Sequence, residues 1–187
     1  MKSNRREFLK TTLYGGLALG VTGSYAGIAQ SCSSGTKPGE TSAGTRPRKG
    51  KPVMGLRCTP VSEVRIAVIG LGRGGGAVER LSQIEGTRIV ALCDLRDDRI
   101  AGSQERLKKH GRPEAATYTG EEDWKKVCER DDIDLIYNAT PWHLHVPIAL
   151  YAMKHGKHAV VEVPAALTLD DCWALVDTAE ETQRHCM

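Results

Sequence analysis

A glycine-rich turn directly after a short apolar run is the feature that most constrains this chain. The run Val64–Ile69 has the residue types of a buried strand, and Gly70-Leu71-Gly72-Arg73-Gly74-Gly75 follows it at once. A helical pattern then covers 77–84. A G-x-G-x-x-G motif between a strand and a helix predicts a turn that binds the pyrophosphate of a dinucleotide.

Each glycine of the motif has an expected task. Gly70 would permit the tight turn, Gly72 would let the backbone approach the pyrophosphate, and Gly75 would allow the helix to pack closely on the strand. Arg73 and Gly74 would complete the phosphate turn. The free N–H groups at the start of the helix would then face the phosphates.

Asp94 closes the second apolar run and is the expected ribose ligand. An acid at this place accepts hydrogen bonds from the adenosine ribose hydroxyls and repels a 2′-phosphate, which favours NAD over NADP. Arg96 lies two residues further on and could soften that preference. The alternative for Asp94 is a cap for the helix that starts near Arg96.

Short apolar runs alternate with helical segments from residue 61 onward. Strands that are apolar along their whole length predict a parallel sheet covered by helices on both faces. The predicted fold class is therefore α/β, a doubly wound parallel sheet of the Rossmann type with right-handed crossovers. The expected strands are 64–69, 88–93, 116–118, 133–139 and 158–163, and the expected helices are 77–84, 96–110, 121–130, 144–155 and 169–184.

The first 32 residues have the pattern of a twin-arginine export signal. Arg5-Arg6 precede Phe8-Leu9-Lys10, and a weakly apolar, glycine-rich stretch follows. An interfacial helix or a signal anchor is the alternative. Cys32 loosely matches a lipoprotein cleavage site, which would add a lipid anchor. The leader predicts passage through the twin-arginine (Tat) machinery to the periplasm or cell envelope.

The rest of the chain divides into a predicted flexible linker, residues 33–60, and a predicted dinucleotide-binding domain, residues 61–187. Residues 58–187 hold 16 basic and 21 acidic side chains, a net charge of −5, which argues against nucleic acid as a partner. Six cysteines are scattered without a C-x-x-C pair. We therefore expect structural thiols and no metal site.

Motifs around the last two expected strands are similar to those of the Gfo/Idh/MocA oxidoreductases. They are Thr140-Pro141 with His145, then Gly156-Lys157-His158, then Glu162-Val163-Pro164, and the resemblance runs from about residue 64 to the end. It implies that the nicotinamide side of the site is lined by Trp142, His143, Leu144, His145, Glu162 and Val163. The family's E-K-P lysine is Val163 here. Valine cannot donate a hydrogen bond or share a proton, so simple alcohol dehydrogenation is in doubt.

A narrower resemblance accounts for that departure. Several stretches of the chain resemble glycoside hydrolase family 109, the NAD-dependent α-N-acetylgalactosaminidases. They include Gly55–Cys58, Ala91–Asp94, Cys128–Leu135, Glu162–Ala166 and Arg184–Met187. The resemblance implies that a hydride leaves C3 of the sugar, a base removes the C2 proton and the C1 group departs. Water then adds at C1 and the hydride returns, so the net reaction is hydrolysis of a carbohydrate substrate.

The predicted leader favours such a redox-neutral cycle, because an exported enzyme has no NADH pool with which to exchange. An NAD-dependent sugar dehydrogenase of the wider family and a non-catalytic nucleotide-binding module are the alternatives. The resemblance also implies a further strand and an α+β substrate domain after Met187. We expect an N-terminal part that is inactive alone, with a homo-oligomer as an open expectation for the full-length protein. The catalytic base is expected beyond Met187. His143 and His145 are candidates for proton transfer or else hydrogen-bonded packing residues.

Overall fold

The structure is a computed structural model that describes residues 46–187. The predicted export signal, Cys32 and the first part of the predicted linker lie outside the described residues. Pro47–Met187 forms one compact unit, which therefore begins inside the segment expected to be linker. Within the described residues, no helix has both the length and the apolar character needed to cross a membrane.

Five parallel strands of the described region form one sheet in the order β3-β2-β1-β4-β5. The strands are β1 (Val64–Ile69), β2 (Thr87–Cys93), β3 (Ala116–Tyr118), β4 (Leu135–Asn138) and β5 (His158–Val161). The helices are α3 (Leu71–Leu81), α4 (Asp97–Lys109), α5 (Asp123–Glu129), α6 (His145–Lys154) and α7 (Leu169–Thr182), and Trp142–Leu144 is a short 3-10 helix, η1. This confirms the predicted doubly wound parallel sheet.

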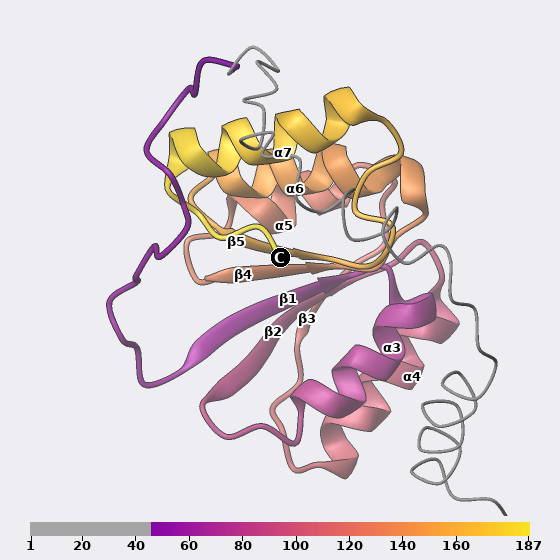
Figure 1. The fold of residues 1–187 in the computed structure, drawn as a ribbon. Helices are drawn as coiled ribbons and strands as arrows, with labels where there is room; N and C mark the ends of the chain where they lie inside the picture. The colour runs from indigo at the N-terminus through magenta and orange to yellow at the C-terminus, as the bar shows by residue number, and fades with distance from the viewer. Residues whose placement is uncertain (1–45) are drawn as a thin grey trace, which may run out of the picture. The chain divides into compact units, whose positions relative to one another are not determined.

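Helices cover both faces of the sheet, as Figure 1 shows. Alternate side chains of β1 divide between two cores, because successive strand residues point to opposite faces. Ile66 and Val68 pack with α3 and α4 on one face. Ala67 and Ile69 pack with α5 and α6 on the other. The near-continuous apolar strands of the sequence are explained by this burial on two sides.

A third core lies between α6, α7 and β5. Leu175 and Ala179 of α7 are buried in it, and Val53 from the segment before β1 packs against it. The segment before β1 is also held by the Gln183 side chain, whose Nε2 donates to the carbonyl of Lys51 at 2.8 Å. Trp173 of α7 is 41% exposed, because the buried face of that helix is the one that carries Leu175.

Helix α3 begins six residues earlier than predicted, at Leu71 rather than at residue 77. Glycines are poor helix formers, so local propensity alone disfavours a helix over the motif. Packing of α3 on the sheet and on α4 overrides that local preference. Strands β4 and β5 are shorter than predicted. Glu162 and Val163 therefore lie in the loop after β5. Cys186, just before the further strand expected after Met187, forms a parallel bridge with Ala159 of β5.

Candidate functional site

The strand order reverses between β1 and β4, and parallel sheets bind ligands beyond the carboxyl ends of their strands at such a point. A cleft of about 640 Å³ opens there, within the range of small-molecule sites. Its lining includes ten of the twelve predicted site residues, namely Gly70, Gly72, Arg73, Asp94, Trp142, His143, Leu144, His145, Glu162 and Val163. Gly74 and Gly75 are buried in α3 instead.

Gly70 makes the turn from β1 into α3 and has a φ of 85°, which favours glycine. A Cβ on Gly70 would lie 2.6 Å from the backbone carbon and oxygen of Ala139, at the end of β4. The turn is therefore pressed against the neighbouring strand end. Because α3 starts at Leu71, the helix supplies no partner for the N–H groups of Gly72 and Arg73. Both residues line the cleft, so their N–H groups suit an anionic ligand.

The close helix–strand contact belongs to Gly74 and not, as expected, to Gly75. A Cβ on Gly74 would lie 2.9 Å from Cγ1 of Val68 and 3.5 Å from Cβ of Ala139. A Cβ on Gly75 would instead meet the guanidinium of Arg106 in α4, at 3.5 Å. Gly75, the last glycine of the motif, thus faces helix α4, and Gly74 faces the sheet.

Asp94 is 9% exposed and binds the glycine turn itself. Its Oδ2 accepts a hydrogen bond from the backbone N–H of Leu71 at 2.6 Å, and its Oδ1 accepts one from the N–H of Arg96 at 2.9 Å. These contacts join the end of β2 to the first residue of α3. A carboxylate has further lone pairs, so hydrogen bonds from a ribose remain compatible with both contacts.

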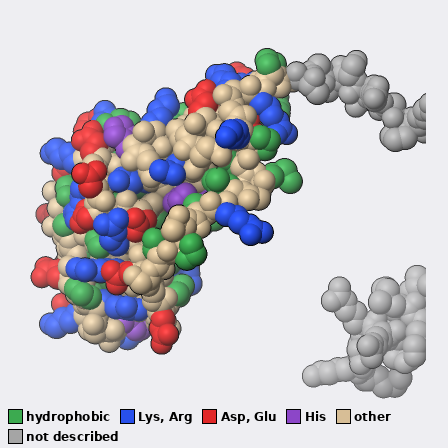
Figure 2. All heavy atoms as spheres, turned by 90° about the vertical axis from the view of Figure 1, so that its left-hand side faces the viewer, with side chains coloured by type: hydrophobic (Ala, Val, Ile, Leu, Met, Phe, Trp, Pro, Cys, Tyr) green, Lys and Arg blue, Asp and Glu red, His purple; other side chains and the backbone are tan. Residues whose placement is uncertain are grey.

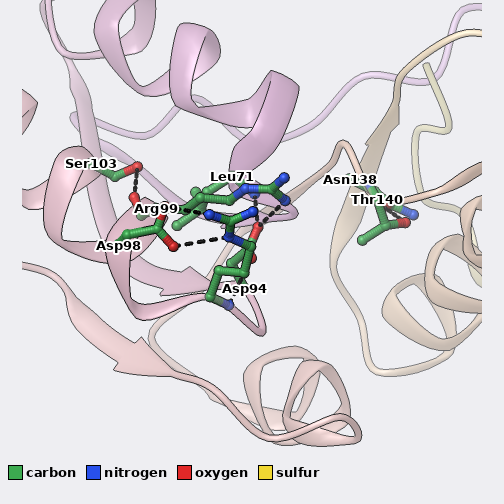
Figure 3. A network of polar contacts seen from close by, with 8 residues as sticks. Leu71, Asp94, Asp98, Arg99, Ser103, Asn138 and Thr140 are labelled. Carbon is green, nitrogen blue, oxygen red and sulfur yellow. Dashed lines mark hydrogen bonds and ion pairs between the residues drawn. The ribbon is translucent and has the colours of Figure 1, made fainter.

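The cation nearest to Asp94 is Arg99 rather than Arg96. The guanidinium of Arg96 makes two hydrogen bonds with the carboxylate of Asp98, at 2.9 and 2.8 Å. Nη1 of Arg99 lies 3.5 Å from Oδ2 of Asp94 and 3.3 Å from the place of a Cβ on Gly72. Figure 3 shows Arg99, Leu71 and Asp94 converging at this side of the cleft.

The opposite side of the cleft is formed after β4 and β5. Trp142 is 59% exposed on η1, and Val163 is 75% exposed in the loop after β5. Glu162 begins that loop, and its Oε1 accepts a hydrogen bond from the hydroxyl of Tyr137 in β4 at 2.6 Å. Burial, together with this bond to the carboxylate, raises the pKa of Tyr137. Tyr137 therefore orients an acidic side chain of the cleft.

His145 is held on both sides by main-chain oxygens. It is 1% exposed, with Nδ1 at 2.8 Å from the carbonyl of Pro164 and Nε2 at 2.9 Å from the carbonyl of Thr140. Carbonyl oxygens only accept, so neither ring nitrogen has a free lone pair directed at a ligand. This arrangement supports the packing role for His145. His143, by contrast, is exposed on η1 and lines the cleft.

Asn138, which the sequence did not single out, shapes the loop that carries these residues. It is fully buried, and its Nδ2 donates to the carbonyl of His145 at 3.1 Å. Its Oδ1 accepts from the hydroxyl of Thr140 at 2.7 Å, and both residues are drawn in Figure 3. A polar residue at the end of an otherwise apolar strand was the signal that could have identified it.

The segment between β3 and α5 was also missed as part of the cleft. Gly120, Glu121 and Glu122 of this segment line the cleft, together with Trp124 in the first turn of α5. The sequence marks this segment only as the start of a helix, so its approach to the cleft depends on how β3 pairs with β2. Cys93 lines the cleft as well, but burial raises the pKa of its thiol to about 12. That thiol is therefore protonated and unsuited to nucleophilic attack.

The five cysteines of the described region are free. Cys93 and Cys128 are buried, in agreement with the structural role expected of them. Cys58 and Cys172 are exposed, which that expectation did not foresee.

Known proteins resemble the chain at two levels. A "Glycosyl hydrolase family 109 protein 1" of Bacteroides fragilis strain YCH46 is 54% identical over 171 residues, which are 87% of this chain and 37% of that protein. An "Alpha-N-acetylgalactosaminidase" of the same species is 51% identical over 136 residues, 72% of this chain and 32% of that protein. The chain thus spans about a third of the length of these relatives.

A solved 3-ketoreductase from Actinomadura kijaniata, in complex with TDP-benzene and NADP, superimposes with a TM-score of 0.56 at 25% identity. The superposition covers 67% of this chain and 38% of that one. A sequence model of the Gfo/Idh/MocA oxidoreductases, described as an oxidoreductase family with an NAD-binding Rossmann fold, matches residues 64–187. The glycine turn, the acid at the end of β2 and the cleft at the strand reversal fit a nicotinamide dinucleotide. The chain therefore belongs to the Gfo/Idh/MocA family and carries its nicotinamide-cofactor-binding domain.

Proposed function

We propose that this chain is the N-terminal, NAD-binding part of an exported glycosidase that hydrolyses terminal α-N-acetylgalactosamine or related glycosides. The observation that carries the proposal is Val163. It lies exposed in the cleft where the wider family's motif has a lysine, and it cannot exchange a proton with an alcohol. Relatives with 51–54% identity are named as family 109 hydrolases and as an α-N-acetylgalactosaminidase.

We also propose NAD rather than NADP as the cofactor. Asp94 is a nearly buried carboxylate, and its Oδ2 is fixed by the N–H of Leu71 at the glycine turn. A 2′-phosphate at that place would meet a negative charge that cannot turn away. Arg99 lies close enough to attract a phosphate, but its nearest partner is the same carboxylate. The charge of Arg99 is therefore partly neutralised before a ligand arrives.

When bound, the nicotinamide supplies reversible hydride transfer to and from a sugar carbon. The N–H groups of Gly72 and Arg73 would hold the pyrophosphate, and Asp94 would hold the ribose. Trp142 and Val163 place apolar surface on the nicotinamide side of the cleft. Glu162, oriented by Tyr137, presents a carboxylate near that side. Both ring nitrogens of His145 face carbonyls, which supports a base from another part of the full-length protein.

The test uses the full-length gene product that contains this chain. It should release N-acetylgalactosamine from an aryl α-glycoside with no net change in NADH absorbance. When the reaction runs in D₂O, deuterium should enter C2 of the product, because elimination removes the C2 proton and water addition restores one. Hydrolysis by two carboxylates leaves the C2 hydrogen in place, so product without deuterium would overturn the mechanism.

Two variants connect activity to the glycine turn. Gly72→Val places a branched side chain beside the guanidinium of Arg99 and in the path of the pyrophosphate, and should abolish both NAD retention and sugar release. Gly76→Val is the matched control, because a Cβ there meets only the mobile end of Arg80 at 3.4 Å. If Gly72→Val is as active as Gly76→Val and both release sugar, the glycine turn does not hold a cofactor that the reaction needs.

The sugar dehydrogenase is the second candidate, favoured by the family to which the chain belongs. It predicts accumulation of NADH when a free sugar is added, and no release of sugar from an aryl glycoside. A full-length protein that holds NAD and does neither would instead support a non-catalytic nucleotide-binding module.

A further inference from the structure

Two of the stretches that resemble family 109 contribute nothing to the cofactor cleft. They are Gly55–Cys58, before β1, and Arg184–Met187, after α7. The structure brings both to the opposite end of the sheet, where the strands begin, and His158, the first residue of β5, lies with them. Figure 2 views the molecule from this side, and histidine side chains (purple) are visible there.

Three side chains converge at this place, namely Cys58, His158 and His185. One ligand atom from each lies within 4.8 Å of the other two. Sγ of Cys58 is 3.5 Å from Nε2 of His158. A tetrahedral zinc ion with bonds of about 2.3 Å to sulfur and about 2.0 Å to nitrogen would hold these two atoms roughly 3.5 Å apart. The observed spacing therefore needs little change to admit an ion.

We propose that Cys58, His158 and His185 form a metal site for Zn²⁺, with water as the fourth ligand. One thiolate and two imidazoles are a donor set suited to this borderline cation. The site would connect the segment before β1, the start of β5 and the segment after α7, which are far apart in the sequence. The site would lie away from the cofactor cleft, at the end of the sheet where the strands begin.

The cluster opens on a groove of about 520 Å³, which leaves room for an ion and its water. Basic and acidic side chains both line this groove. Of the basic ones, Arg65 is paired with Asp134 at 2.6 Å, and Nε of Arg184 donates to the carbonyl of Gly156 at 2.7 Å. Burial lowers the pKa of His158, and the charges of His185 and Arg184 lower it further. The thiolate supplies negative charge at the site itself.

Binding requires one rearrangement in the cluster. The backbone N–H of His185 donates to Nδ1 of His158 at 3.0 Å, so the neutral ring carries its proton on Nε2, toward Cys58. An ion bound to Nε2 replaces that proton, and Nδ1 takes up a proton from solvent. The hydrogen bond from the backbone N–H of His185 to Nδ1 of His158 is then lost. The thiol proton of Cys58 leaves to solvent, so zinc binding is weaker at low pH.

The experiment uses the 187-residue chain, reduced, freed of metal with a chelator and then dialysed against Zn²⁺. We expect about one zinc ion per chain by elemental mass spectrometry, and a thiolate charge-transfer band when Co²⁺ replaces zinc. Cys58→Ser and His185→Gln should each weaken binding at least about tenfold. Cys172→Ser is the matched control, because Cys172 is also an exposed cysteine but lies outside the cluster.

A chain without retained zinc, unchanged binding in either cluster variant, or equal loss in Cys172→Ser would each overturn the proposal. If the cluster variants do not fold, alkylation of the unmodified chain decides the question. Zinc should slow the reaction of iodoacetamide with Cys58 and leave that of Cys172 unchanged. Equal rates at Cys58 with and without zinc would refute the site.

Discussion

The contact between helix α3 and the sheet can be tested with two glycines of the same helix. Gly74 and Gly76 both lie in α3, and alanine stabilises a helix interior by about 1 kcal/mol relative to glycine. A Cβ on Gly74 would meet Cγ1 of Val68 at 2.9 Å, a distance that real side chains essentially never show. A Cβ on Gly76 would meet only the end of the Arg80 side chain, at 3.4 Å. The two substitutions share the helix effect and differ in the clash.

We expect Gly76→Ala to stabilise the domain by about 0.5–1 kcal/mol. In Gly74→Ala the same gain is opposed by overpacking of a buried contact, which costs typically about 1–3 kcal/mol. The difference between the two variants isolates the overpacking and should therefore be about 1–3 kcal/mol. For a unit of this size it corresponds to a difference in Tm of roughly 3–10 °C.

Urea unfolding followed by circular dichroism measures this difference directly. The m-values of both variants should match that of the unmodified chain, since neither change alters the surface exposed on unfolding. If both variants are stabilised equally, the backbone of α3 does not approach β1 as closely as the structure shows. The packing role would then return to Gly75, as the motif alone suggested.

Three further outcomes follow from the same structure. Asp94→Ala should weaken NAD binding by about 10–100-fold, since hydrogen bonds to a charged group contribute about 1.5–3 kcal/mol, and should reduce discrimination against NADP. Isothermal titration calorimetry with both nucleotides measures these affinities, and unchanged values would show that Asp94 does not bind the ribose. Hydrogen bonds from Arg65 hold the pKa of Asp134 below its usual range. This pair therefore stabilises the fold above about pH 4, and the contribution is lost as pH falls through the lowered pKa. Arg65→Gln should flatten the loss of unfolding free energy at acid pH, measured by urea titration with a chelator present, and an unaltered dependence of that free energy on pH would contradict this. Replacement of Arg5-Arg6 by two lysines should keep the full-length protein in the cytoplasm in cell fractionation, because the twin-arginine route reads that pair; export that persists would refute the predicted leader.

The local pattern of this chain was enough to predict its fold class. Strands buried on both faces read as near-continuous apolar runs, and β1, β2 and β3 fall within one residue of their predicted bounds. Gly70 was identifiable because few residues other than glycine adopt its positive φ. Asp94 was identifiable because the end of β2 is a fixed place in this fold.

Contacts between distant segments decided the rest. The start of α3 at Leu71, the exchange of roles between Gly74 and Gly75, and the approach of Arg99 to Asp94 all depend on how helices pack against the sheet. The meeting of Cys58, His158 and His185 joins residues up to 127 positions apart, which the difference of their numbers shows. Local propensity extends over a few residues only. Which side chains face one another across the sheet is set by burial of the whole core, and only the tertiary structure records it.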